Sequence, residues 1–283
     1  MMDFLKKTGD NSFKIDYLKE GERNNDKDFT NQFTQPGITV NGNNKFNGLF
    51  DCDEVIVDIT EKWMKLLYNV HELKQYFTPE IIKVLDNGMV NLREEYFIAK
   101  WLKVNDKTHL ETLHNVYDKC NTFYDDLDVT PFFKSFEKTA KVFNRIDVLT
   151  KVTSNEINNE TSLRSKLNFL VRAFDIIKMS NPDLQVFIHR VPLHEKKSDF
   201  INKLDLRFNM YAEDLHHNVD DVLLNTDKHN YEILMPLTGY NRKYIRDGAN
   251  SEKRNEKTVS LTPFCNMSNM DAETLIHILG LMG

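Results

Sequence analysis

Short apolar strands alternate with amphipathic helices in the second half of this chain, and this order constrains the fold more than any other feature. The strand-like runs lie at 146–155, within 181–191, at 207–214 and at 231–237, and helical patterns separate them at 162–178, 196–204 and 217–224. Such alternation predicts a parallel sheet with helices on both faces. We therefore expect an α/β fold, and 283 residues suffice for one large domain that carries an insertion.

The first half of the chain has a different character. One apolar strand leads into Asp51, and a helical pattern runs from near Thr60 to about residue 140. A helix over 131–146 then leads into the second strand. Because this block stands between the first and second strands, we expect an all-helical cap inserted over the carboxyl edge of the sheet. The predicted divisions are a polar, irregular arm at 1–45, an α/β core at 46–59 and 141–245, a helical cap at 60–140, and a polar linker with a short helix at 246–283.

Composition limits the setting and the partners. The net charge of −6 argues against broad binding to nucleic acid, so no stable nucleic-acid partner is expected. The three cysteines form neither a disulfide framework nor a zinc motif, which favours a reducing, cytoplasmic setting. No apolar run approaches the roughly 20 residues needed to span a bilayer. We expect a soluble protein, and a homodimer is an open alternative because the helix at 271–282 could pack on a sister subunit.

Two carboxylates lie directly after the first strand. Asp51 and Asp53 are two residues apart, so they point to the same side only if the chain leaves the regular pleat between them. In an open α/β sheet, ligands bind at this edge. One carboxylate could act as a nucleophile and the other could exchange a proton, and the pair offers oxygen ligands for Mg²⁺. A polar loop after a strand is the alternative interpretation.

Hydroxyl and amide side chains end the second predicted strand. Thr153, Ser154 and Asn155 stand where hydroxyl and backbone N–H groups suit a phosphate, although turn formation alone also explains them. A lysine pair follows at the start of the helix at 196–204. Lys197 could neutralise a phosphoryl group beside a carboxylate, and Lys196 competes for that role. The helix dipole disfavours a lysine at a helix start, which indicates a purpose other than stability; ordinary solvated surface lysines are the alternative.

Paired acids follow the strand at 207–214. Glu213 and Asp214 come after a buried run, where acids are unfavourable unless they bind a cation or hydrogen-bond donors; capping of the next helix is the alternative. The neighbouring His216 and His217 are interpreted as loop residues. Each motif taken alone is common, but all four fall in order at successive strand ends or helix starts, which chance explains poorly.

These four motifs resemble those of the haloacid dehalogenase (HAD) phosphatases. Within that superfamily, residues 51–58 are similar to the opening of the 5′(3′)-deoxyribonucleotidases, as are the Thr153–Ser154 pair, Arg190 and the segment 213–219. The resemblance covers residues 46–245 and implies a Rossmann-like sheet with a helical cap. It also implies a Mg²⁺-dependent phosphatase whose substrate is a small phosphorylated compound, namely a (deoxy)nucleoside monophosphate.

The resemblance also implies roles for single residues. Asp51 would form an aspartyl-phosphate, and Asp53 would protonate the leaving oxygen and then activate water. Thr153 would bind the phosphoryl group, Lys197 would stabilise its charge, and Asp214 would complete the Mg²⁺ site with Asp51 and the Asp53 carbonyl.

Substrate binding would fall to Ser154, Asn155 and Arg190. The chain departs from the family pattern at Glu54, where a glycine is usual, and at Glu213, where an aspartate is usual. The spacing around Lys197 also differs from that of the nucleotidases.

Base recognition would come from the cap. Four aromatic side chains there could stack on a base, although their helical spacing fits a core equally well: Trp63, Tyr96, Phe97 and Trp101. Two alternatives stay open: a HAD phosphatase for another small phosphoester or a nucleic-acid end, and a HAD-fold binding module without activity.

Overall fold

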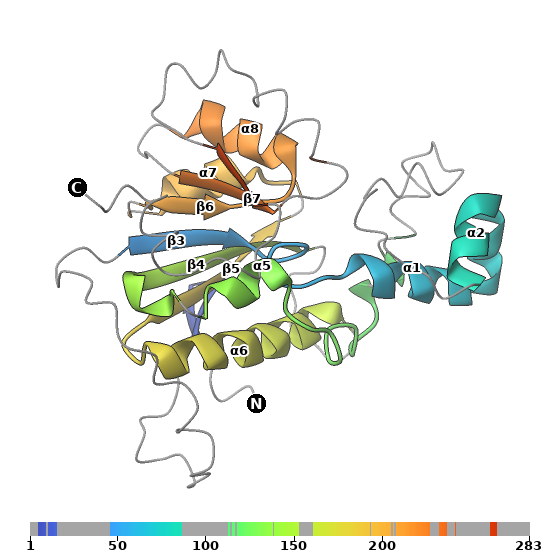
Figure 1. Ribbon diagram of the computed structural model, residues 1–283, viewed down its shortest axis with the longest axis horizontal. Helices are drawn as coiled ribbons and strands as arrows, with labels where there is room; N and C mark the ends of the chain where they lie inside the picture. The colour runs from blue at the N-terminus through green and yellow to red at the C-terminus, as the bar shows by residue number, and fades with distance from the viewer. Residues whose placement is uncertain are drawn as a thin grey trace, which may run out of the picture.

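The fold is a single mixed sheet between two layers of helices (Figure 1), seen in a computed structural model. The structure describes residues 5–9, 11–15, 46–86, 113, 115–116, 118–137, 139–152, 161–192, 194–204, 206, 208–226, 232–236, 241 and 261–264.

The sheet has eight strands in the order β1-β2-β5-β4-β3-β6-β7-β8. The strands are β1 (Leu5–Gly9), β2 (Ser12–Ile15), β3 (Phe46–Asp51), β4 (Phe143–Val152), β5 (Gln185–Pro192), β6 (Met210–Ala212), β7 (Glu232–Pro236) and β8 (Leu261–Phe264). The six strands from β5 to β8 pair in parallel, so their carboxyl ends share one edge. β3 lies between β4 and β6, which places its last residue, Asp51, near the middle of that edge.

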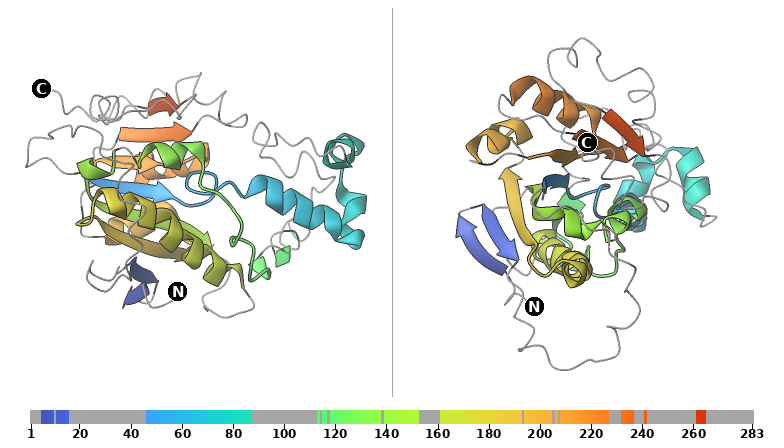
Figure 2. Two further views of the ribbon diagram at one scale, coloured as in Figure 1. Left: turned by 60° about the horizontal axis from the view of Figure 1, so that its bottom comes forward. Right: turned by 60° about the vertical axis from the view of Figure 1, so that its left-hand side comes forward.

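Helices cover both faces because β3 and its neighbours bury apolar side chains on each side. The helical elements are α1 (Thr60–Asn69), η3 (His71–Tyr76), α2 (Pro79–Asp86), α5 (Pro131–Ser135), η5 (Ala140–Val142), α6 (Ser162–Ser180), α7 (Lys197–Lys203) and α8 (His216–Asn225). Phe50 belongs to the core that includes residues of α5 and α6, whereas Leu49 belongs to the core that includes residues of α7 and α8. Figure 2 shows these helices on opposite sides of the strands. The prediction of a Rossmann-like α/β sheet with helices on both faces is confirmed.

The prediction of an irregular arm at 1–45 is wrong in part, because β1 and β2 form a hairpin there. β2 pairs antiparallel with β5, and β1 adds a further antiparallel strand at the edge of the sheet. Phe13 and Ile15 are buried, two residues apart as a half-buried strand requires. Only four residues carry this pattern, and their partner strand lies more than 170 residues away in sequence.

Two further boundaries differ from prediction. The chain enters β4 at Phe143, so the helix expected over 131–146 divides into α5 and the short η5, because pairing with β3 outweighs the local helical spacing. At the other end, β8 pairs in parallel with β7 inside the segment expected to be a linker. Pro263 is compatible with a strand at the edge of a sheet, where a missing N–H is tolerated. The helix expected at 271–282 lies outside the described residues.

The predicted cap is described only in part. α1, η3 and α2 extend away from the carboxyl edge of the sheet (Figure 1), and residues 87–112 lie outside the described part. Trp63 on α1 is 1% exposed, and its indole Nε1 donates to the Leu113 carbonyl at 3.3 Å. Trp63 is therefore a core residue, whereas Tyr96, Phe97 and Trp101 lie outside the described residues. The division into core and cap stays a prediction.

Candidate active site

The site begins where β3 ends. Asp51 is the last residue of the strand, and the chain then makes a tight turn in which the Glu54 N–H donates to the Val57 carbonyl at 2.6 Å. Glu54 has a φ of 63°, in the left-handed region that glycine adopts most readily, and a glycine is usual at this position in the family that the sequence resembles. The chain thus leaves the regular pleat directly after the nucleophile candidate, as the Asp51–Asp53 spacing requires.

The Glu54 side chain connects this turn to α1. Its Oε1 accepts hydrogen bonds from the backbone N–H of Ile59 at 3.0 Å, from the N–H of Thr60 at 2.9 Å and from the Thr60 hydroxyl at 2.7 Å. Glu54 is 3% exposed. A buried carboxylate at the first turn of α1 satisfies the helix N–H groups and complements the helix dipole. Glu54 therefore fixes α1 relative to the Asp51–Asp53 turn.

Lys197 links the strand ends on the α7 side of the site. It is the first residue of α7 and only 2% exposed, and its Nζ lies 2.7 Å from Asp51 Oδ1 and 2.8 Å from Glu213 Oε2. Lys196, in contrast, is exposed, and its Nζ lies 3.8 Å from Asp221. Of the two lysines, the structure places Lys197 against Asp51.

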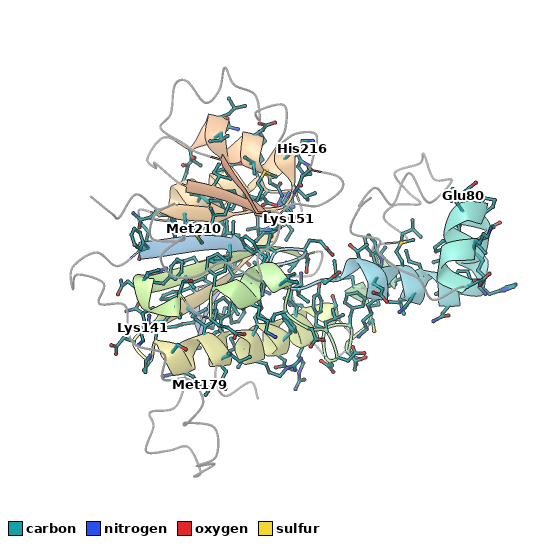
Figure 3. All side chains as sticks on the ribbon, in the orientation of Figure 1. Glu80, Lys141, Lys151, Met179, Met210 and His216 are labelled. Carbon is teal, nitrogen blue, oxygen red and sulfur yellow. The ribbon has the colours of Figure 1, made fainter. Side chains whose placement is uncertain are left out.

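Glu213 and Asp214 follow β6 and lie close to Asp51 at the end of β3. Glu213 accepts hydrogen bonds from Lys197 Nζ, from the Tyr211 hydroxyl at 2.5 Å and from the Leu215 N–H at 3.1 Å. With three donors, Glu213 holds Lys197 in place. Figure 3 labels Met210 at the start of β6, and Lys151 and His216 at the carboxyl edge of the sheet.

The charges at this cluster are strongly coupled. Burial, followed by the nearby Glu213 carboxylate, raises the pKa of Asp51 to about 7, although Lys197 acts in the opposite direction. Burial also disfavours the charged form of Glu213, but Lys197 and three hydrogen bonds outweigh it and lower the pKa to about 2. For Lys197, burial acts to lower the pKa, and the two carboxylates outweigh it and raise the pKa above its usual value. Asp51 would therefore gain more than Glu213 from an added cation.

The acidic side chains offer a metal site. Carboxylate oxygens of Asp51, Glu213 and Asp214 lie within 4.8 Å of one another, and all three residues are buried. Mg²⁺ prefers oxygen ligands of this kind, so the donor set fits the ion that the sequence predicts. Both oxygens of Glu213 already accept hydrogen bonds, Oε2 from Lys197 and Tyr211 and Oε1 from the Leu215 N–H, whereas Lys197 contacts Oδ1 of Asp51. Asp51 and Asp214 are therefore the better ligands. The role of the Asp53 carbonyl stays a prediction.

Asp53 contacts two residues that sequence reasoning missed. Its Oδ2 accepts from Lys166 Nζ at 2.7 Å, and its Oδ1 accepts from the Tyr124 hydroxyl at 3.0 Å. Lys166 interrupts the apolar face that Leu163 and Leu170 form on α6. A lysine within such a face is the signal that could have identified it.

Of the four remaining residues predicted to bind phosphate or substrate, only Arg190 lies within the described part of the structure. Thr153, Ser154 and Asn155 lie outside the described residues, just after the end of β4. Arg190 on β5 donates to Asn11 Oδ1 at 3.2 Å, and its guanidinium carbon lies 5.3 Å from the centre of the Phe13 ring. These contacts connect Arg190 to the N-terminal hairpin. Substrate binding by all four residues stays a prediction.

Comparison with known proteins gives likenesses of fold. No protein-family model and no curated protein matches the sequence. A protein from Clostridium difficile that is proposed to be a phosphatase is 16% identical, with a TM-score of 0.43 over 83% of this chain and 99% of that one. A HAD hydrolase of family IA from Entamoeba histolytica is 11% identical, with a TM-score of 0.35 over 83% and 99% of the two chains. A HAD family hydrolase from Deinococcus radiodurans, solved with bound phosphate and sodium, is 15% identical, with a TM-score of 0.37 over 84% and 97%.

All three TM-scores are below 0.5, so the functional conclusion depends on the geometry of the site. None of the helices within the described ranges has both the length and the hydrophobicity that a membrane span needs.

Proposed function

We propose that this chain is a HAD-type phosphatase that hydrolyses phosphate monoesters through an aspartyl-phosphate on Asp51. The contact that supports this most directly is the Lys197 ammonium between Asp51 and Glu213, at the carboxyl end of β3. A buried cation against a strand-end carboxylate is suited to a phosphate, because it reduces the repulsion between two anions that must meet. The acidic pair after β6 and Asp53 in the adjoining turn supply the other groups that the reaction needs.

In the proposed reaction, an Asp51 carboxylate oxygen attacks the phosphorus atom as the bond from phosphorus to the ester oxygen breaks. Asp53 gives a proton to the departing oxygen, which leaves as an alcohol. Asp53 then takes a proton from water, whose oxygen attacks the phosphorus of the aspartyl-phosphate, and inorganic phosphate departs as Asp51 is regenerated. Lys197 stabilises negative charge throughout, since positioning and electrostatics dominate phosphoryl transfer.

The Mg²⁺ site belongs to the same proposal. Asp51 and Asp214 would hold the ion through their side chains, and the Asp53 carbonyl would be a third ligand. Bound Mg²⁺ would neutralise charge between the phosphate and the buried carboxylates.

We further propose that the substrate is a (deoxy)nucleoside monophosphate, so that the enzyme is a 5′-nucleotidase. The similarity of residues 51–58 and 213–219 to the deoxyribonucleotidases supports this choice. A phosphatase for another small phosphoester, or for a nucleic-acid end, is the alternative.

The experiment measures phosphate release from a panel of nucleoside monophosphates with Mg²⁺, for the wild type and Asp51→Asn. Asp126→Asn is the matched control, because Asp126 is an exposed aspartate that pairs with Lys62 at the surface. We expect activity in the wild type and the control, and a loss of at least about 1,000-fold in Asp51→Asn, since the nucleophile is removed. Equal release by Asp51→Asn, or no release by the wild type, would refute the proposal and favour a binding module.

A further inference from the structure

Both oxygens of the Asp53 carboxyl group have donors, and the donors come from two different segments. Lys166 Nζ on α6 lies 2.7 Å from Oδ2, and the Tyr124 hydroxyl, in the segment that precedes α5, lies 3.0 Å from Oδ1. The side-chain torsion that turns a carboxyl group is normally broad. Donors on both oxygens therefore fix the orientation of this one.

Lys166 is built into the core. It is 2% exposed, and its Nζ also donates to the Thr150 hydroxyl on β4 at 2.9 Å and lies 5.0 Å from the centre of the Tyr124 ring. Replacing a buried ion pair by apolar residues is often neutral or stabilising, so fold stability alone gives no reason for a lysine here. The charge is better explained by what it does to Asp53.

Tyr124 is itself held by α6. The Tyr124 N–H donates to the Ser165 hydroxyl at 2.8 Å, and that hydroxyl donates to Asp125 Oδ1 at 2.8 Å. Arg172 Nη2 donates to the carbonyls of Tyr124 at 3.3 Å and Asp125 at 3.0 Å. Figure 2 shows the start of α6 beside this segment. One helix thus positions both donors, Lys166 directly and Tyr124 through its backbone.

We infer that Lys166 and Tyr124 are positioning residues that orient the Asp53 carboxyl for proton transfer to the leaving oxygen. This inference rests on the proposed function. Misplacing a catalytic group by about 1 Å can cost about 100-fold in rate, so two fixed donors have a kinetic consequence.

The consequence depends on the leaving group. An alcohol leaves poorly without a proton, whereas p-nitrophenolate leaves readily as an anion. If Lys166 and Tyr124 orient Asp53, their loss slows the first step for an alkyl ester and hardly affects it for p-nitrophenyl phosphate. A purely structural role for these residues would slow both substrates equally.

The test measures the first turnover by rapid quench for a nucleoside 5′-monophosphate and for p-nitrophenyl phosphate. The variants are Lys166→Met, which keeps the length of the side chain, and Tyr124→Phe, which removes only the hydroxyl. Lys203→Met is the matched control, because Lys203 is 66% exposed and pairs with Glu195 on the surface.

We expect Lys166→Met to slow the first turnover at least about 30-fold with the nucleotide and less than about threefold with the aryl ester, because misplacing Asp53 removes part of the about 100- to 10,000-fold that acid–base catalysis supplies. After the p-nitrophenolate burst, steady-state turnover should also fall, because Asp53 activates water in the second step. Tyr124→Phe should show the same pattern with a smaller loss, and Lys203→Met should show none.

Equal losses on both substrates in Tyr124→Phe and Lys166→Met, or a change confined to KM, would overturn this inference and leave the proposed function standing. A wild type that releases no phosphate from either substrate would overturn the proposed function and this inference with it.

Discussion

Glu54 combines a left-handed backbone with a buried carboxylate, and substitutions can separate the effects of the two. Glu54→Ala keeps the φ of 63° and removes the acceptor of three hydrogen bonds. Ile59 and Thr60 are 3% and 2% exposed, so water cannot easily replace the lost acceptor. An unsatisfied buried donor costs about 1–3 kcal/mol, and we expect Glu54→Ala to lower the free energy of unfolding by about 3 kcal/mol.

Glu54→Gly loses the same hydrogen bonds but removes the backbone strain. A left-handed conformation costs an L-residue about 1–2 kcal/mol, and the greater freedom of glycine in the unfolded chain returns part of that gain. The glycine variant should therefore be more stable than the alanine variant by about 1 kcal/mol. Glu54→Gln keeps the acceptor without its charge, and we expect it to lose only about 1 kcal/mol.

Urea unfolding followed by tryptophan fluorescence tests this order, because Trp63 on α1 is buried close to the residues that Glu54 binds. Glu61→Ala is the control: Glu61 is exposed on the same helix and pairs with Lys65, so the change should stay within about 0.5 kcal/mol. A glycine variant no more stable than the alanine variant would refute the strain argument. Equal stability of Glu54→Gln and Glu54→Ala would refute the role of the hydrogen bonds.

Three further perturbations test the site and the core. Lys197→Met removes the cation that pairs with Asp51 and Glu213, beside Asp214, so we expect the free energy of unfolding, measured by thermal unfolding, to fall by about 3 kcal/mol. Millimolar Mg²⁺ should reduce this loss, and a variant as stable as the wild type would contradict the prediction. Chelation with EDTA should lower both the Tm and the activity of the wild type, and added Mg²⁺ should restore both. In Asp214→Asn, added Mg²⁺ should restore neither. A wild type whose Tm and activity do not change with EDTA would exclude the metal site. Gly48→Ala should lower the free energy of unfolding in urea by about 1–3 kcal/mol, because the added Cβ would lie 2.9 Å from the Phe50 ring and 3.0 Å from the Phe143 ring. An unchanged urea midpoint would show that these rings can move.

Local sequence patterns predict part of the site at the carboxyl edge of the sheet. An apolar strand that ends in Asp51 and a strand followed by Glu213 and Asp214 can both be recognised from neighbouring residues alone. Parallel strands have their carboxyl ends at one edge of the sheet, so the closeness of Asp51 to Glu213 and Asp214 follows from the fold class. The fold class does not decide between Lys196 and Lys197, because both lysines stand side by side at the start of the same helix and the sequence pattern fits either one. Packing decides between the two, by burying Lys197 and leaving Lys196 exposed.

Other features depend on contacts between residues far apart in the chain. The hairpin β1–β2 and the edge strand β8 carry only four or five residues each, too few for a reliable pattern, and pairing with β5 and β7 stabilises them. Lys166 reaches Asp53 across 113 positions of sequence. The amino-acid sequence by itself determined the α/β class and the order of the acidic motifs, because strand and helix periodicities and strand-end residues are local. Only the tertiary structure decided which lysines meet which carboxylates, because burial and long-range pairing are properties of the whole chain.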